Sequence, residues 1–94
     1  SAQKMSVKGQ LADSTNAPLP AATVLLLHAK DSSLANFGVS DAQGFFEIRN
    51  VSKGSYLFKV SFLGFRTITR PIEVGEANPV VELGRMNMQA ISAE

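Results

Sequence analysis

The feature that most constrains the fold of this chain is an alternation of apolar and polar residues with a period of two. Turn-forming Gly, Pro, Asn and Asp residues interrupt it about every 8 to 12 positions. Side chains of a β-strand point alternately to its two faces, so this period is typical of strands with one buried face. No window shows the period of an amphipathic helix. The pattern therefore predicts an all-β domain.

We expect seven short strands, and seven strands in only 94 residues suit a two-sheet Greek-key sandwich better than a closed barrel. The expected strands span 5–12, 22–30, 36–40, 45–49, 55–63, 65–74 and 80–88.

Two of these segments carry information about their position in a sheet. Segment 22–30 is apolar on both faces, with Leu26 on one and Leu25 and Leu27 on the other. This predicts a central strand, or a strand whose outer face is covered by another module. Pro71 has no backbone N–H to donate, so it predicts an edge strand or a break in segment 65–74.

The length indicates one domain. We assign residues 1–5 to an N-terminal tail, 6–89 to the domain and 90–94 to a C-terminal tail or cut linker. The first residues lack a charged and apolar signal sequence, which leaves a cytosolic, a processed or an excised chain as alternatives.

Composition argues against several classes of function. Nine Lys and Arg against eight Asp and Glu leave a net charge of +1, which favours neither nucleic acid nor an anionic membrane as a partner. The longest apolar run, 21–27, is far shorter than the roughly 20 residues that a membrane helix needs, so we expect no membrane insertion. The chain has no cysteine, which excludes disulfides and thiolate metal sites and is compatible with the bacterial periplasm.

No set of residues has the spacing of a catalytic, metal or cofactor site. His28 is the single histidine and lies in an apolar strand, so we expect a structural or interface role. Asp31 and Asp41 are expected to form turns rather than to bind calcium. Glu73 and Glu76 are expected to be solvated rather than an acid and base pair. The glycines are dispersed and cradle no phosphate, so we predict that the domain is not an enzyme and has no cofactor.

The aromatic residues divide into core and surface candidates. Alternation places Phe46 and Phe58 in the core. It leaves Phe37, Phe45 and Phe65 as the candidates for exposed contact residues, including a sugar-stacking face for a glycan.

Five segments together resemble a known family. The segments are VKGQLAD at 7–13, PLPAATV at 18–24, SDAQGFF at 40–46, GSY at 54–56 and VSFLGF at 60–65. In order and spacing they are similar to the carboxypeptidase-regulatory-like, transthyretin-like (Ig-like) domain over about residues 6 to 89. More narrowly, they resemble the N-terminal extension of TonB-dependent outer-membrane receptors in the Bacteroidetes.

The resemblance also suggests which positions support turns and the core. Gly9 is expected to let two backbones approach, Pro18 to set the first crossover, and Asp41 to Gly44 to close a hairpin. Phe65 stands where the family usually has Tyr, which removes one hydroxyl group. The full set of expected turn and core positions is Gly9, Pro18, Asp41, Gly44, Gly54, Tyr56 and Gly64.

The resemblance implies a non-catalytic accessory domain at the periplasmic face of the outer membrane. Its expected partners are a TonB-type energy-transducing protein and the plug and barrel of the same nutrient receptor. The alternatives are a carbohydrate-binding module or a structural spacer, in a surface protein or beside a zinc carboxypeptidase. A transthyretin-like hydrolase of hydroxyisourate is an enzyme alternative, but its histidine- and arginine-bearing end motifs have no counterpart here.

Overall fold

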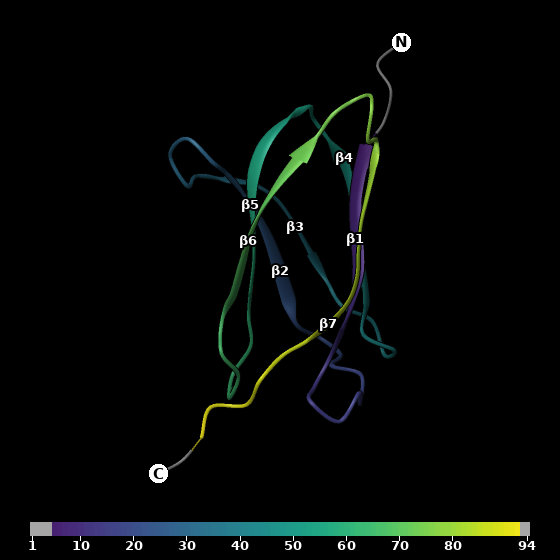
Figure 1. The fold of residues 1–94 in the computed structure, drawn as a ribbon, viewed down its shortest axis with the longest axis vertical. Coiled ribbons are helices and arrows are strands. Elements are labelled where there is room, and N and C mark those ends of the chain that lie inside the picture. The colour runs from purple at the N-terminus through teal and green to yellow at the C-terminus, as the bar shows by residue number, and fades with distance from the viewer. Residues whose placement is uncertain (1–4, 93–94) are drawn as a thin grey trace.

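The computed structural model describes residues 5–92 and shows two β-sheets packed face to face (Figure 1). The strand order is β4-β1-β7 in the three-stranded sheet and β3-β2-β5-β6 in the four-stranded sheet. This confirms the predicted all-β, seven-stranded sandwich; the expected tail residues 1–4 and 93–94 lie outside the described range. The strands are β1 Met5–Ala12, β2 Thr23–His28, β3 Leu34–Val39, β4 Phe45–Val51, β5 Gly54–Ser61, β6 Ile68–Val74 and β7 Val80–Asn87.

Three strands, β2, β3 and β6, differ in extent from the prediction for identifiable reasons. β2 ends at His28 because a tight turn follows: the Ser32 N–H donates to the His28 carbonyl at 2.8 Å and the His28 N–H to the Ser33 carbonyl at 2.8 Å. β3 consequently begins at Leu34, two residues earlier than expected. β6 begins only at Ile68, because the residues before it form a turn and pair with the C-terminal segment instead.

The chain passes repeatedly between the two sheets, and this corrects one expectation. Asp41 to Gly44 forms a tight turn, with the Gly44 N–H donating to the Asp41 carbonyl at 2.9 Å, but it does not close a hairpin ladder. β3 pairs with β2 in one sheet and β4 pairs with β1 in the other. The Gly44 carbonyl accepts the Leu11 N–H of β1 at 2.8 Å, so the chain leaves this turn already bound to the opposite sheet.

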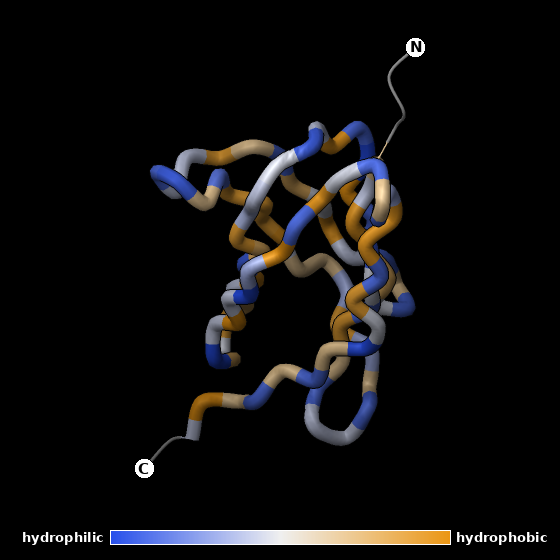
Figure 2. Tube along the Cα trace, turned by 45° about the horizontal axis from the view of Figure 1, so that its top comes forward, coloured by the Kyte–Doolittle hydropathy of each residue, from blue (hydrophilic) through white to orange (hydrophobic). Residues whose placement is uncertain are grey.

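The core fills the space between the sheets with alternate residues of each strand, and Figure 2 shows the alternation of hydrophobic and hydrophilic residues along them. The Phe46 ring of β4 stacks on the Phe58 ring of β5 across the two sheets, with 5.4 Å between centroids. Burial of each large apolar side chain contributes about 1.5–3 kcal/mol. The largest fully buried side chains are Val7, Leu11, Val24, Leu26, Ile48, Phe58, Val60 and Met88.

A buried serine holds the first crossover between the sheets. Ser40 Oγ donates to the Leu19 carbonyl at 2.7 Å and accepts the Ala22 N–H at 2.9 Å. These bonds satisfy backbone groups that no strand partner reaches, which avoids the cost of unpaired buried polar groups. The segment before β2 is thereby fixed to the end of β3.

The edges of the four-stranded sheet are β3 and β6. Pro71 lies in β6, as its missing backbone N–H predicted, because an edge strand has one side without a ladder partner. Beside this edge, the chain after β7 crosses toward the residues before β6. The Arg66 N–H donates to the Gln89 carbonyl and the Ile91 N–H to the Gly64 carbonyl, each at 2.8 Å. Residues 90 and 91, which were assigned to a C-terminal tail or cut linker, thus pair with the turn before β6.

Candidate binding surface

The outer face of the four-stranded sheet carries apolar side chains that nothing in the described chain covers. β2 lies between β3 and β5, as expected of a central strand. Its inward residue Leu26 is fully buried, whereas the outward Leu25 and Leu27 are only half-buried. An apolar outer face on a small domain is typical of a surface that meets another protein.

Exposed apolar residues gather on edge strand β3 and at the start of β4. Phe37 is 58% exposed, Val39 54% and Leu34 57%, and Phe45 at the start of β4 is 53% exposed. The structure therefore places two of the three aromatic contact candidates, Phe37 and Phe45, on the surface. Sequence reasoning missed Leu34 and Val39. Val39 alternates with Phe37 and could have been found by the period of two, whereas Leu34 reaches the same face only because of a bulge in the β2–β3 ladder.

A hollow of about 540 Å³ adjoins this edge, where β3 approaches the outer face of the three-stranded sheet. Val39 and Phe45 supply apolar lining, and Gly9 and Gly84 contribute no side chain. Lys8 and Glu47 are among the charged residues that complete the lining. The hollow thus offers the exposed ring of Phe45 beside several groups that form hydrogen bonds.

Charges around the hollow are mixed in sign. Lys8 Nζ lies 3.9 Å from Glu82 Oε2, and Arg49 Nε lies 3.0 Å from Glu47 Oε1. These side chains are substantially exposed, so each pair contributes at most about 1 kcal/mol. The surface consequently has no one-signed field that would attract a polyanion.

Phe65, the third aromatic candidate, is not an exposed contact residue. It is half-buried, packs against the core and stacks on Phe62 with 5.8 Å between ring centroids. The expectation of exposure was wrong because the strand period does not continue through the turn before β6. There Phe65 pairs with Ala90 of the crossing C-terminal segment.

The expected turn residues Asp41 and Gly44 lie at one turn. Asp41 Oδ1 accepts the N–H groups of Gln43 and Phe45, each at 2.9 Å. Gly44 has φ +83°, and a Cβ there would overlap the carbonyl oxygen of Leu11. This position therefore requires glycine, and it orients Phe45 at the start of β4.

The remaining expected turn positions are spread along the molecule. Pro18 pairs with Ala12 in an isolated bridge at the first crossover. Gly54 opens β5 beside the Tyr56 ring, and Gly64 lies in the turn before β6. Gly9 faces the core under the ring of Phe46.

A second hollow, of about 510 Å³, lies at the end of the sheet around His28 and Tyr56. The two ring centroids are 5.6 Å apart. Tyr56 Oη donates to the Ser52 carbonyl at 2.6 Å, and burial raises the pKa of this phenol above its usual 10.0. His28 thus packs against a core tyrosine, as expected of a structural histidine.

The carboxylates serve turns and strand pairs. Asp31 Oδ1 accepts the Ser33 hydroxyl at 2.7 Å, and this bond lowers the pKa of Asp31. Glu73 accepts the Ser55 hydroxyl at 2.7 Å.

Among residues 5–92, no three His, Cys, Asp or Glu side chains converge as metal ligands. Over the same residues, no helix has the length and hydropathy to cross a bilayer.

Solved structures share this fold at low sequence identity. The TIE protein of Bacillus anthracis aligns with a TM-score of 0.76 and 16% identity over 94% of this chain and 17% of its own. The pilus 2b backbone protein of group B streptococcus aligns with a TM-score of 0.67 and 18% identity over 92% and 41%. Chlorocatechol 1,2-dioxygenase from Pseudomonas putida aligns with a TM-score of 0.67 and 13% identity over 93% and 60%.

These likenesses are ones of fold, and the chain spans less than two thirds of each of the three structures. No curated protein sequence matches the chain. The model of the carboxypeptidase regulatory-like domain matches residues 6–88, and this match supports a non-catalytic β-sandwich module. The chain belongs to the carboxypeptidase regulatory-like domain family.

Proposed function

We propose that this domain is a docking module of a TonB-dependent outer-membrane nutrient receptor. In this role it lies in the periplasm ahead of the plug and barrel and modulates how a TonB-type energy-transducing protein engages the receptor. The family assignment over residues 6–88 supports the proposal, together with the sequence motifs shared with such N-terminal extensions.

One structural observation carries the docking role: the exposed apolar edge formed by Phe37 and Val39 of β3 and by Phe45 of β4. Monomeric soluble domains rarely expose large contiguous apolar patches without a partner. Aromatic residues are also enriched at the centres of protein interfaces. The mixed, weak charges beside this edge suit a protein partner better than a polyanion.

Photo-crosslinking from this edge tests the docking role. A photoreactive phenylalanine analogue replaces Phe37 in the receptor that carries the domain, and the same analogue replaces Leu63 in a control. Leu63 is 96% exposed and lies in the turn before β6, away from β3. We expect a crosslink to the periplasmic part of the TonB-type protein from position 37 and none from position 63.

Deletion of residues 6–88 from the same receptor tests the modulating role. We expect nutrient uptake to change while the amount of receptor in the outer membrane stays the same. Unchanged uptake together with no crosslink from position 37 would contradict the proposal and would leave a structural spacer as the simpler role.

A carbohydrate-binding module is the second candidate, and the hollow beside Phe45 favours it. An aromatic ring next to Lys8, Gln10 and Glu47 combines stacking with hydrogen-bonding groups. A glycan array probed with the wild-type chain and with Phe45→Ala decides this role. Binding that disappears in the variant supports it, and silence of the wild type rejects it.

A further inference from the structure

A line of four apolar residues crosses the whole outer face of the four-stranded sheet. Leu27 of β2 pairs with Leu34 of β3 and with Leu57 of β5, and Leu57 pairs with Pro71 of β6. Residues paired across a ladder point to the same face. This face lies opposite the core, because the flanking residues of β2 and β5 are buried. We call these four residues the leucine row.

Two opposite charges lie on either side of the leucine row. Lys59 follows Leu57 by two residues on β5, and Glu73 follows Pro71 by two residues on β6. Because β5 and β6 are antiparallel, these equal steps run in opposite directions. The two charges are therefore about 13 Å apart along the strands, at about 3.3 Å per residue.

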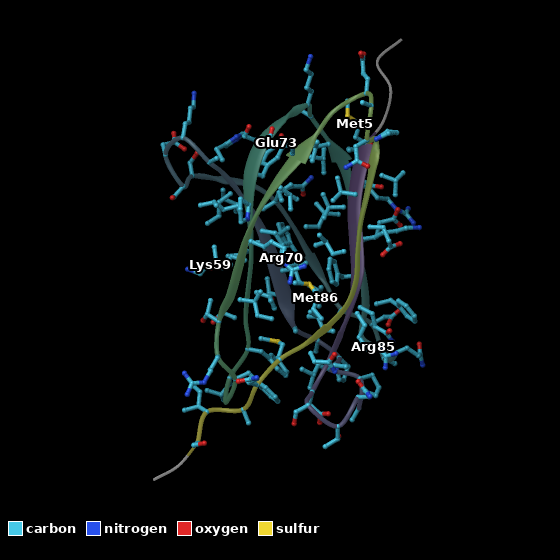
Figure 3. The ribbon with its side chains drawn as sticks, viewed as in Figure 1. Met5, Lys59, Arg70, Glu73, Arg85 and Met86 are labelled. Carbon is cyan, nitrogen blue, oxygen red and sulfur yellow. The ribbon has the colours of Figure 1, made fainter. Side chains whose placement is uncertain are left out.

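Neither charge is neutralised within the described chain. The ion pairs among residues 5–92 involve Lys8 with Glu82 and Arg49 with Glu47. Over the same residues, the Glu73 carboxylate accepts the Ser55 hydroxyl at 2.7 Å and takes part in no ion pair. In Figure 3 the Lys59 side chain leaves the four-stranded sheet on the side away from β1 and β7.

We propose that the leucine row is the contact face of a symmetric dimer of this chain. A two-fold axis along the row turns the face onto itself, so the row packs against the same row of the second copy. The same rotation brings Lys59 opposite Glu73 of the second copy, and Glu73 opposite its Lys59. A surface that contacts itself in this way is the defining property of a two-fold interface.

The charge arrangement selects a second copy as the occupant. An unrelated partner would need only some apolar surface and could face any pattern of charge. In a two-fold interface, two opposite charges neutralise each other between the copies when they lie at equal distances on opposite sides of the axis. Lys59 and Glu73 meet this condition apart from an offset of one strand, about 4.8 Å, which the long, flexible Lys59 side chain can span. This inference goes beyond the receptor role proposed above, and because Phe37 lies on the same sheet face, the dimer and docking through Phe37 are alternative states of that face.

A charge-swap series tests the pairing in the 94-residue chain. Sedimentation equilibrium measures dimer dissociation for the wild type, Lys59→Glu, Glu73→Lys and the double variant. Each single variant places like charges opposite one another twice per dimer, so we expect its dissociation constant to rise at least about tenfold. The double variant restores both pairs and should return close to the wild-type value. Lys53→Glu makes the same charge change in the turn before β5 and should have no effect.

An apolar substitution tests the row itself. Leu34→Asp introduces a charge at a residue that is 57% exposed, and we expect loss of the dimer. Leu63→Asp makes the same change at a residue that is 96% exposed in the turn before β6 and should leave the dimer intact. Circular dichroism on all variants separates loss of association from loss of folding.

Three outcomes overturn the proposal. A wild-type chain that stays monomeric at millimolar concentration would leave the leucine row to a different protein. A dimer that Lys59→Glu and Glu73→Lys leave unchanged would lie on another surface. Single variants that dissociate without rescue in the double variant would show that Lys59 and Glu73 do not face each other.

Discussion

The ring of Phe46 lies directly against Gly9 of the neighbouring strand, and a Cβ placed on Gly9 would be 2.9 Å from Phe46 Cζ and 3.0 Å from the carbonyl oxygen of Gly84. The two residues are ladder partners between β1 and β4. The ring therefore occupies the space that a side chain at position 9 would take. Through its stack on Phe58, this contact also joins the two sheets.

Gly9→Ala should destabilise the domain by about 1–3 kcal/mol, because the added methyl group forces the Phe46 ring and the β7 backbone to move. Gly75→Ala is the control, since a Cβ at Gly75 would meet nothing within 4 Å. Urea denaturation of both variants measures the difference. Equal midpoints for Gly9→Ala and the wild type would show that the Phe46 ring moves without cost.

Tyr56→Phe removes the hydrogen bond to the Ser52 carbonyl and should lower the free energy of unfolding by about 1 kcal/mol.

Burial raises the pKa of Tyr56, so the folded state favours the protonated phenol. This contribution is complete below the unfolded pKa of about 10 and is lost as the pH rises through the folded pKa. As the pH rises above about 10, the urea midpoint of the wild type should therefore fall, and the midpoint of Tyr56→Phe should fall less. Parallel pH profiles would contradict this role.

Asp13 and Asp31 should make the domain sensitive to acid. The Thr15 hydroxyl bond is the main cause that lowers the pKa of Asp13, and the Ser33 hydroxyl bond lowers that of Asp31. A lowered folded pKa gives stability that is present above the unfolded pKa and is lost as the pH falls through the folded one. Replacing Asp13 and Asp31 by Asn keeps a side-chain oxygen that accepts the hydrogen bonds but removes the carboxyl group that titrates. The double variant should show a flatter denaturation profile below pH 3.8 than the wild type.

Phe65→Ala should destabilise the domain by about 1–2 kcal/mol, because the ring is half-buried against Phe62 and the core. Phe45→Ala, at a residue that is 53% exposed, should change stability by no more than about 0.5 kcal/mol. Thermal unfolding of both variants compares them directly. A smaller effect at Phe65 than at Phe45 would mean that Phe65 is a surface residue after all.

Local periodicity was sufficient to predict the strands that alternate cleanly. β5 shows this best, because Tyr56, Phe58 and Val60 follow a strict period of two and all are buried. Glycine and aspartate likewise indicate turns through their own backbone preferences, as at Asp41 and Gly44. These features depend on neighbours within a few residues, which a single sequence displays.

The candidate surface was predictable only in part. Phe37 and Phe45 were expected to be exposed and are, because they alternate with buried or inward residues of their own strands. The exposure of Phe65 could not be judged in this way. Its environment depends on Ala90, twenty-five residues further along the chain, which pairs with it.

What the sequence determined by itself was the class of fold, its strands and most of its turns, because each follows from hydropathy and backbone preference over a few residues. Only the tertiary structure decided that the Asp41 turn joins two sheets, that Phe65 is covered, and that Lys59 and Glu73 lie on either side of one apolar row. The physical reason is that these features depend on which strands pair and in which register. Pairing is set by the packing of the whole core, and no local segment of the chain encodes it.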